Sequence, residues 1–161
     1  MHIDRLERFW LGAVAAMLGS FMAALIASVV LFGVSLPSPS GRVDPTRLDA
    51  TEFANPGLRS DGGSRYTLTV VGRMWRFDVG QRTGQPAELR VPAGSEITFV
   101  ATSADVVHGF QVEDHNVNLM LIPGQISRKT AVFDQPGTYR ILCHEYCGPG
   151  HHTMVAAVVV E

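Results

Sequence analysis

The stretch TYRILCHEYCGPGHHTMVAAVVV, residues 138–160, predicts two β-strands joined by a loop that carries both cysteines of the chain. TYRIL (138–142) and MVAAVVV (154–160) are short runs rich in β-branched and aromatic residues, which strands favour. Between them, the GPG sequence at 148–150 lets the backbone turn tightly. Because a sheet would hold both ends of this loop, its side chains can converge on one point.

Apolar runs of similar length follow one another from Arg65 onward, separated by turn sequences such as VPAG, IPGQ and QPGTY. Turns at intervals of about 8–12 residues are typical of sandwiches and barrels. We therefore predict an all-β fold, an antiparallel β-sandwich of about eight strands. The earlier runs are YTLTVVG (66–72), MWRFDV (74–79), AELRVP (87–92), EITFVAT (96–102), VVHGFQV (106–112), VNLMLI (117–122) and KTAVF (129–133).

Residues 9–36 contain no charged side chain and predict a transmembrane helix. About 20 apolar residues are enough to cross a bilayer. A cleaved signal peptide has a shorter apolar region of about 7–15 residues, and an amphipathic surface helix needs a polar face. Residues 1–8 precede the span. Residues 37–64, rich in Pro, Gly, Ser and Asp, predict a surface linker.

The charge pattern excludes a nucleic-acid-binding protein. The net charge is −2 and the chain has a single lysine, whereas binding to nucleic acid requires a dense basic patch. Positive charges on the two sides of the predicted span are nearly balanced, so they do not fix its orientation.

The loop of the opening stretch gathers soft metal ligands. Cys143, Cys147, His151 and Met154 follow one another at spacings of four, four and three residues. Thiolate and thioether favour copper, and electron-transfer copper sites use a weak axial Met. Zinc is an alternative, because the two cysteines with His151 and His152 make a four-ligand set. A disulfide between the cysteines is a second alternative, although it leaves the neighbouring His and Met unexplained.

A further imidazole ligand has to come from outside the loop, and His108 is the candidate. It lies in the run ADVVHGF, far from the loop in the sequence. A lone histidine in an apolar run is more often a buried core residue, but a copper loop needs a partner. Blue-copper sites use one Cys and two His, so a second thiolate suggests a second metal ion that both sulfur atoms bridge.

Together these residues resemble subunit II of the haem–copper terminal oxidases, which carries the dinuclear copper A centre. The motif C-x-E-x-C-G-x-x-H-x-x-M covers residues 143–154, and D-V-V-H at 105–108 and P-G-x-Y at 136–139 also match. The resemblance implies a cupredoxin-like copper A domain over residues 65–161. One membrane span followed by a short domain resembles the short, B-type members.

The resemblance implies six metal ligands. The two cysteines would bridge two coppers. One copper would be bound by the first histidine and the methionine, and the other by the second histidine and the backbone carbonyl of the glutamate. Two coppers that share two thiolates spread one electron over a rigid core, so its transfer needs little rearrangement. The ligands would be His108, Cys143, Glu145, Cys147, His151 and Met154.

The resemblance also implies partners. Electrons would arrive from cytochrome c or a similar small carrier and leave to a haem in subunit I, which reduces O2 and pumps protons. The carboxylate of Glu145 would point towards subunit I, where many members hold Mg2+. Trp75 would be the electron entry, because members hold an aromatic residue over the copper site. Arg73 and Arg76 flank it where long members are more aromatic, and a tryptophan that packs the sheet edge is the alternative.

The site also predicts the localisation. Because the donor and copper loading lie outside the cytoplasm, residues 1–8 would face the cytoplasm and the sandwich would lie on the periplasmic side of the inner membrane. Asp105, Glu113 and Asp114 could contribute to a carrier-docking face, although a solvated loop is the simpler explanation.

Two other functions remain compatible with these residues. A nitric oxide reductase fed through a dinuclear copper centre would have the same site. A membrane-anchored copper chaperone would have exposed, exchangeable ligands and no aromatic residue over them. In the favoured interpretation the enzyme is the whole complex, a cytochrome c oxidase, and this chain alone acts on no substrate.

Overall fold

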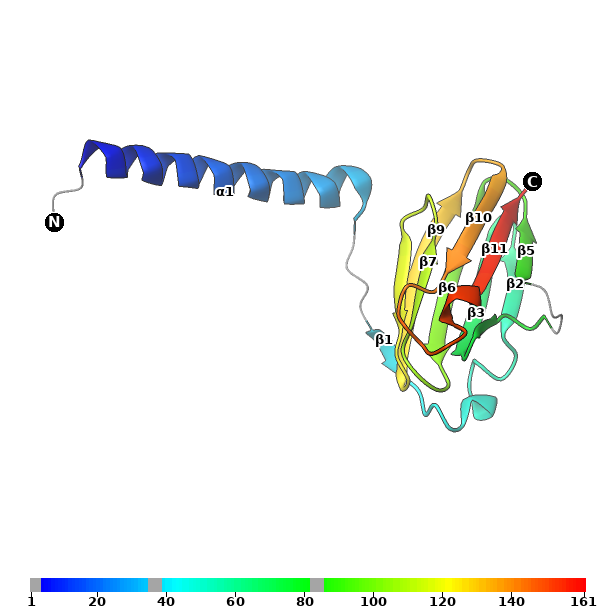
Figure 1. Ribbon diagram of the computed structural model, residues 1–161. Coiled ribbons are helices and arrows are strands. Elements are labelled where there is room, and N and C mark those ends of the chain that lie inside the picture. The colour runs from blue at the N-terminus through cyan, green and yellow to red at the C-terminus, as the bar shows by residue number, and fades with distance from the viewer. Residues whose placement is uncertain (1–3, 35–38, 82–85) are drawn as a thin grey trace. The chain divides into compact units, whose positions relative to one another are not determined.

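The computed structural model describes residues 4–34, 39–81 and 86–161, and the chain divides into two units, Met1–Leu36 and Pro37–Glu161 (Figure 1). Parts of the predicted N-terminus, span and linker fall on residues 1–3 and 35–38, which lie outside the described residues, as do residues 82–85.

In its described part the first unit contains one helix, α1 (Arg5–Phe32), which is long and apolar enough to cross a membrane. Asp4 begins it with a capping box. Its side chain accepts hydrogen bonds from the backbone of Leu6 and Glu7, and the Glu7 carboxylate accepts one from the Asp4 backbone. Gly33 ends the helix with a φ of 60°. The helix therefore starts at Arg5 rather than at residue 9, because its cap lies in the polar residues that precede the apolar run.

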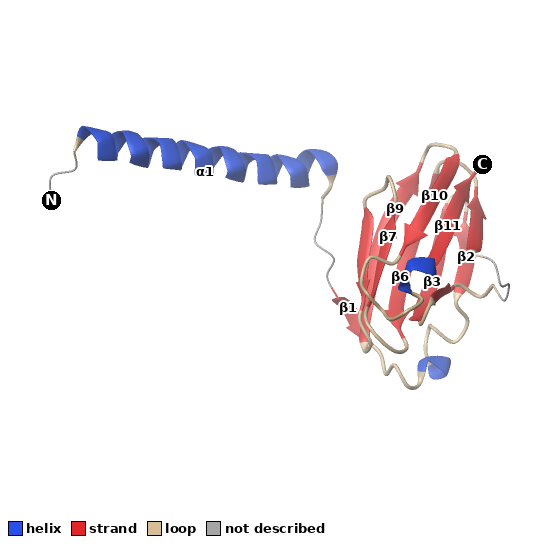
Figure 2. Cartoon of the chain, in the orientation of Figure 1, coloured by secondary structure: helices blue, strands red, loops and turns tan. Residues whose placement is uncertain are grey.

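The second unit is a sandwich of two β-sheets (Figure 2). Sheet A has the order β1-β9-β6-β3-β2, with β4 paired to β3, and sheet B has the order β5-β11-β10-β7-β8. The predicted sandwich is confirmed, and every run predicted as a strand overlaps one. The strands are β1 (Pro39–Arg42), β2 (Gly57–Gly62), β3 (Arg65–Arg73), β4 (Arg76–Asp78), β5 (Ala87–Val91), β6 (Ser95–Ser103), β7 (His108–Val112), β8 (Val117–Leu121), β9 (Gln125–Phe133), β10 (Gly137–Leu142) and β11 (Val155–Val160).

The strand pairing is mixed rather than wholly antiparallel. β3 pairs in parallel with β6, and β11 pairs in parallel with β5. In these two pairs the predicted antiparallel arrangement is wrong. Alternating burial indicates which face of a strand is covered, but it carries no information on the direction of the neighbouring strand.

The described part of the predicted linker, residues 39–64, differs from that prediction. β1 pairs with β9 and β2 pairs with β3, so each adds an edge strand to sheet A. Between them, a short 3-10 helix, η1 (Leu48–Ala50), and the residues after it cover that sheet, with Leu48 and Phe53 buried against Val71 and Ile126. Edge strands with exposed side chains need no alternating pattern, so no periodic signal marks them.

The core between the sheets consists of alternate residues from facing strands. Phe110 packs edge-on against Phe77 and tilted against Phe99, with ring centroids 5.1 and 5.7 Å apart. Full burial of such a side chain contributes about 1.5–3 kcal/mol. Cys143, Cys147 and Met154 belong to this same cluster, so packing in the sandwich anchors the loop that joins β10 to β11.

Candidate metal centre

His108 is the first residue of β7, and its side chain is fully buried. Its Nε2 atom lies 2.8 Å from Oδ1 of Asp105. Its Nδ1 atom is buried without a hydrogen-bond partner among the described residues, an arrangement that is unfavourable by about 1–3 kcal/mol. Gly72 leaves room for the ring, because a Cβ atom there would lie 2.8 Å from Cδ2 of His108. Nδ1 is therefore the atom of this ring that remains able to bind a metal.

Asp105 holds the His108 ring in place. Its Oδ1 also accepts a hydrogen bond from the backbone of Val106 at 2.6 Å, and its Oδ2 accepts one from the backbone of Met74 at 2.7 Å. Burial alone would raise the pKa of Asp105, but the hydrogen bonds from His108, Met74 and Val106 outweigh it and hold the pKa below its ordinary value. An ionised Asp105 favours the tautomer of His108 with its hydrogen on Nε2. The lone pair of Nδ1 is then free to bind a metal.

Figure 1 shows the loop between β10 and β11. Cys143 and Cys147 lie in this loop. Both are free thiols with their sulfur atoms 3.9 Å apart, far beyond the roughly 2.05 Å of a disulfide bond. One ring nitrogen of His108 and the two Sγ atoms lie within 4.8 Å of one another. β10 and β11 pair along their whole length, and the Cys143 amide donates to the carbonyl of Met154 at 3.3 Å. The sheet therefore closes the loop at both ends.

The remaining predicted ligands lie around the two sulfur atoms. Sγ of Cys147 is 3.6 Å from Nδ1 of His151 and 3.8 Å from Sδ of Met154. His151 begins the 3-10 helix η2 (His151–Thr153), and Met154 follows this helix with 1% of its surface exposed. The carbonyl oxygen of Glu145 lies 3.3 Å from Sγ of Cys143. Donor atoms from all six residues predicted as ligands thus come together in one cluster.

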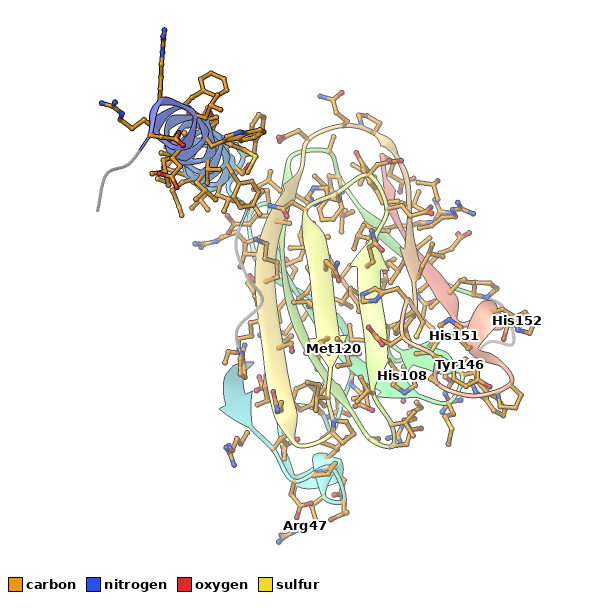
Figure 3. All side chains as sticks on the ribbon, turned by 60° about the vertical axis from the view of Figure 1, so that its left-hand side comes forward. Arg47, His108, Met120, Tyr146, His151 and His152 are labelled. Carbon is orange, nitrogen blue, oxygen red and sulfur yellow. The ribbon has the colours of Figure 1, made fainter. Side chains whose placement is uncertain are left out.

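This donor set fits copper. It contains two thiols, two imidazoles and a thioether, which are the soft and intermediate ligands that copper prefers. Burial raises the pKa of the Cys147 thiol to about 11, and the neighbouring Cys143 adds to the shift. A bound metal ion would therefore displace thiol protons. His152, which the zinc alternative requires, is exposed, and Figure 3 shows it at the margin of the molecule.

Trp75 lies over the loop between β10 and β11, residues 143–154, called the ligand loop below because it carries most of the predicted ligands. Its Nε1 donates to the carbonyl of Cys147 at 3.1 Å, and 41% of the residue is exposed. Glycine makes this approach possible, because a Cβ atom on Gly150 would lie 2.5 Å from Cδ2 of Trp75. The residue lies in the turn between β3 and β4 rather than within a strand. Trp75 therefore has one side on the loop and one side open to solvent.

The three acidic residues considered for a docking face do not lie together. Asp105 is engaged with His108, whereas Glu113 and Asp114 follow the opposite end of β7. Glu113 forms an ion pair with Arg140 at 2.6 Å. Figure 3 shows His108 and His151 at one end of the sandwich, with the exposed Tyr146 beside them. Sequence reasoning missed the contact of Asp105 with His108, although the D-V-V-H match contained both residues.

Comparisons with known proteins test which family this chain belongs to. Residues 82–161 match the model of the cytochrome c oxidase subunit II periplasmic domain. A cytochrome c oxidase subunit 2 from Thermus thermophilus is 38% identical over 161 aligned positions, which cover 96% of this chain and 91% of that relative. The chain belongs to the cytochrome c oxidase subunit 2 family. As predicted, this subunit II chain is part of an oxidoreductase complex.

Solved structures of similar proteins share the fold of this chain. A chain of a haem–copper terminal oxidase dimer, determined by cryo-EM, matches with a TM-score of 0.80 and 32% identity over 98% of this chain and 100% of that one. The periplasmic domain of cytochrome oxidase subunit II from Bradyrhizobium japonicum matches with a TM-score of 0.51 and 23% identity over 59% of this chain and 83% of that domain. The sandwich of this subunit II chain is therefore cupredoxin-like, and the chain is a membrane protein with an N-terminal apolar helix.

Proposed function

We propose that this subunit II chain is the electron-entry subunit of a cytochrome c oxidase. A dinuclear copper centre would accept electrons from cytochrome c or a similar carrier, and the haem of subunit I would receive them for O2 reduction coupled to proton pumping. The observation that carries the proposal is the cluster of His108 with two free thiols, in which a buried ring nitrogen has no hydrogen-bond partner among the described residues.

In the proposed centre the side chains of the loop and of β7 hold the metal pair. When bound by the two cysteines, a copper pair would supply one-electron transfer with little rearrangement. The chain contributes rigidity, because its sulfur atoms are packed in the core and Asp105 fixes the ring of His108. The proposed ligands are His108, Cys143, Cys147, His151, Met154 and the backbone carbonyl of Glu145.

Trp75 is the proposed entry point for electrons. Its exposed side can contact a docked carrier, and its hydrogen bond leads to the backbone of Cys147. The path from the protein surface to a proposed bridging residue therefore consists of one side chain and one hydrogen bond.

The orientation follows from the same role. We place the N-terminus in the cytoplasm and the sandwich on the periplasmic side, because a carrier and copper loading are both available there. The side chain of Glu145 is 43% exposed, so its carboxylate remains available to approach subunit I and bind Mg2+ at that contact.

The test uses the full-length chain in detergent, loaded with copper. We expect two coppers per chain and a paramagnetic spectrum whose hyperfine pattern comes from one electron shared equally by two copper nuclei. One copper per chain, with the pattern of a single nucleus, would overturn the dinuclear centre. His152→Ala changes an exposed histidine of the same loop and serves as the control that keeps the wild-type spectrum. O2 uptake measured against NO consumption by the purified complex distinguishes the two terminal acceptors.

A further inference from the structure

His144 lies between two proposed ligands, Cys143 and Glu145, at a position that the copper motif leaves free. Its ring lies against Gly109 of β7, because a Cβ atom on Gly109 would be 2.6 Å from three atoms of that ring. Its Nε2 atom lies 2.8 Å from Oδ1 of Asn118 in β8. One side chain thus connects the ligand loop to both strands of the neighbouring hairpin.

The hydrogen bond of His144 has a defined direction. An amide oxygen only accepts hydrogen bonds, so Nε2 of His144 carries the hydrogen and donates it to Asn118. Nδ1 lies 3.7 Å from Oε1 of Glu145, which is too long for a hydrogen bond. Among the described residues, Asn118 is therefore the hydrogen-bond partner of this ring.

The contact continues a strand pairing that stops just before the ligands. β10 pairs with β7 at Ile141 and Leu142, where Leu142 lies opposite Gln111. The same register, continued into the loop, places His144 opposite Gly109 and Glu145 opposite His108. The backbone pairing of β10 with β7 ends at Leu142. The side chain of His144 therefore supplies the next connection between the loop and β7.

We infer that His144 is a positioning residue for the metal centre. Its hydrogen bond to Asn118 holds the backbone from Cys143 to Glu145 beside β7, and so fixes the carbonyl of Glu145 relative to His108. This inference rests on the proposed copper function. A weak ligand such as a carbonyl oxygen is sensitive to its placement, so a loosened loop would change the reduction potential more than the copper content.

The experiment compares His144→Leu and Asn118→Ala in the full-length chain. Both remove the hydrogen bond, and because Asn118 is exposed, we expect its change to leave the sandwich folded. In the metal-free chain, we expect amide hydrogen exchange at residues 143–147 to accelerate by about fivefold to tenfold. In the copper-loaded chain, we expect both variants to shift the reduction potential in the same direction, and the double variant to shift it no further.

Two matched variants complete the test. His144→Gln keeps a donor of similar length and should restore the wild-type exchange and potential, and His152→Leu should leave both unchanged. Unchanged exchange in both His144→Leu and Asn118→Ala would overturn the inference. So would additive shifts of potential, because two residues acting through one hydrogen bond are not independent. The exchange measurement needs no copper, so it tests the role of His144 even if the wild-type chain fails to form a copper pair.

Discussion

Two histidines, His108 at the start of β7 and His115 in the turn after its far end, have the same hydrogen-bonding pattern in different surroundings. Nε2 of His108 forms a hydrogen bond with Oδ1 of Asp105 at 2.8 Å, and Nε2 of His115 forms one with the carbonyl oxygen of Val132 at 2.9 Å. In both rings, Nδ1 is buried without a hydrogen-bond partner among the described residues. By this criterion alone the two residues are equivalent.

What surrounds the rings separates them. A ring nitrogen of His108 lies within 4.8 Å of the two cysteine sulfur atoms. His115 stacks on Phe133 with ring centroids 4.2 Å apart, and it meets Tyr139 edge-on at 5.9 Å. Aromatic faces offer dispersion and quadrupole contacts but no ligand atom. An unpartnered imidazole nitrogen therefore indicates a metal site only where other donor atoms converge on it.

Removing a sulfur atom is the most severe test of this comparison. Cys147→Ser should destroy the copper pair, because a hydroxyl is a harder and weaker copper ligand than a thiolate. We expect metal analysis of the full-length chain to fall from two coppers to at most one, and O2 uptake by the complex to fall to background. Tyr146→Phe, in the exposed neighbour, should change neither. Two coppers retained in the serine variant would contradict bridging by Cys147.

Replacing each histidine in turn tests the comparison directly. His108→Gln should weaken copper binding by more than the roughly 10–100-fold loss that accompanies changes in residues that only orient a ligand. His115→Gln should leave the copper affinity unchanged, because His115 lies outside the cluster of His108 with the two cysteines. Competition with a copper chelator of known affinity measures both. Equal losses in the two variants would mean that folding, rather than ligation, is affected.

Asp105→Asn tests what orients the first ring. The amide oxygen can still accept from Nε2 of His108, but the NH2 group replaces the oxygen that accepts from the Met74 backbone. Because the neutral side chain also no longer makes the imidazole a stronger ligand, we expect about tenfold weaker copper binding in the same competition assay. Asp114→Asn is the matched control, because this exposed residue has a φ of 55°, which asparagine tolerates. A wild-type affinity for Asp105→Asn would show that the carboxylate only holds the turn at Met74.

The sequence predicts those features of the fold and site whose pattern lies among neighbouring residues. β5 and β8 bury every second residue, so their pattern predicts strands. β1 and β2 are exposed edge strands without such a pattern. The candidate ligands of the loop follow one another within a few residues, and their spacing is visible in the chain. The contacts of Asp105 with Met74 and of His144 with Asn118 join distant segments, and no spacing encodes them.

Met154→Leu should have a smaller effect, confined to the metal. The side chains have similar volumes, so the free energy of unfolding should fall by less than about 1.5 kcal/mol. We expect copper to be retained and the reduction potential to move, by about 59 mV for each tenfold change in the relative affinity for the two oxidation states. Potentiometry measures the shift, with Met120→Leu in β8 as the control. Loss of copper would contradict a weak-ligand role for Met154.

His115→Phe should have the smallest effect. The variant loses the hydrogen bond to Val132, but it no longer buries an Nδ1 atom without a hydrogen-bond partner. The stacking on Phe133 is retained. The free energy of unfolding, measured by denaturant titration, should change by less than about 1 kcal/mol, with copper content unchanged. A loss above about 2 kcal/mol would show that the imidazole contributes more than its aromatic face.

The sulfur atoms proposed as ligands are also core atoms, which sets an order for folding and metal loading. Cys143, Cys147 and Met154 pack among aliphatic and aromatic side chains between the sheets, and β10 and β11 pair through their own backbones. The chain would therefore finish folding before the proposed copper binds, unlike zinc fingers, which stay unfolded until metal binds. Binding of the proposed copper would then be a maturation event separate from folding, which a cell could time independently of protein synthesis.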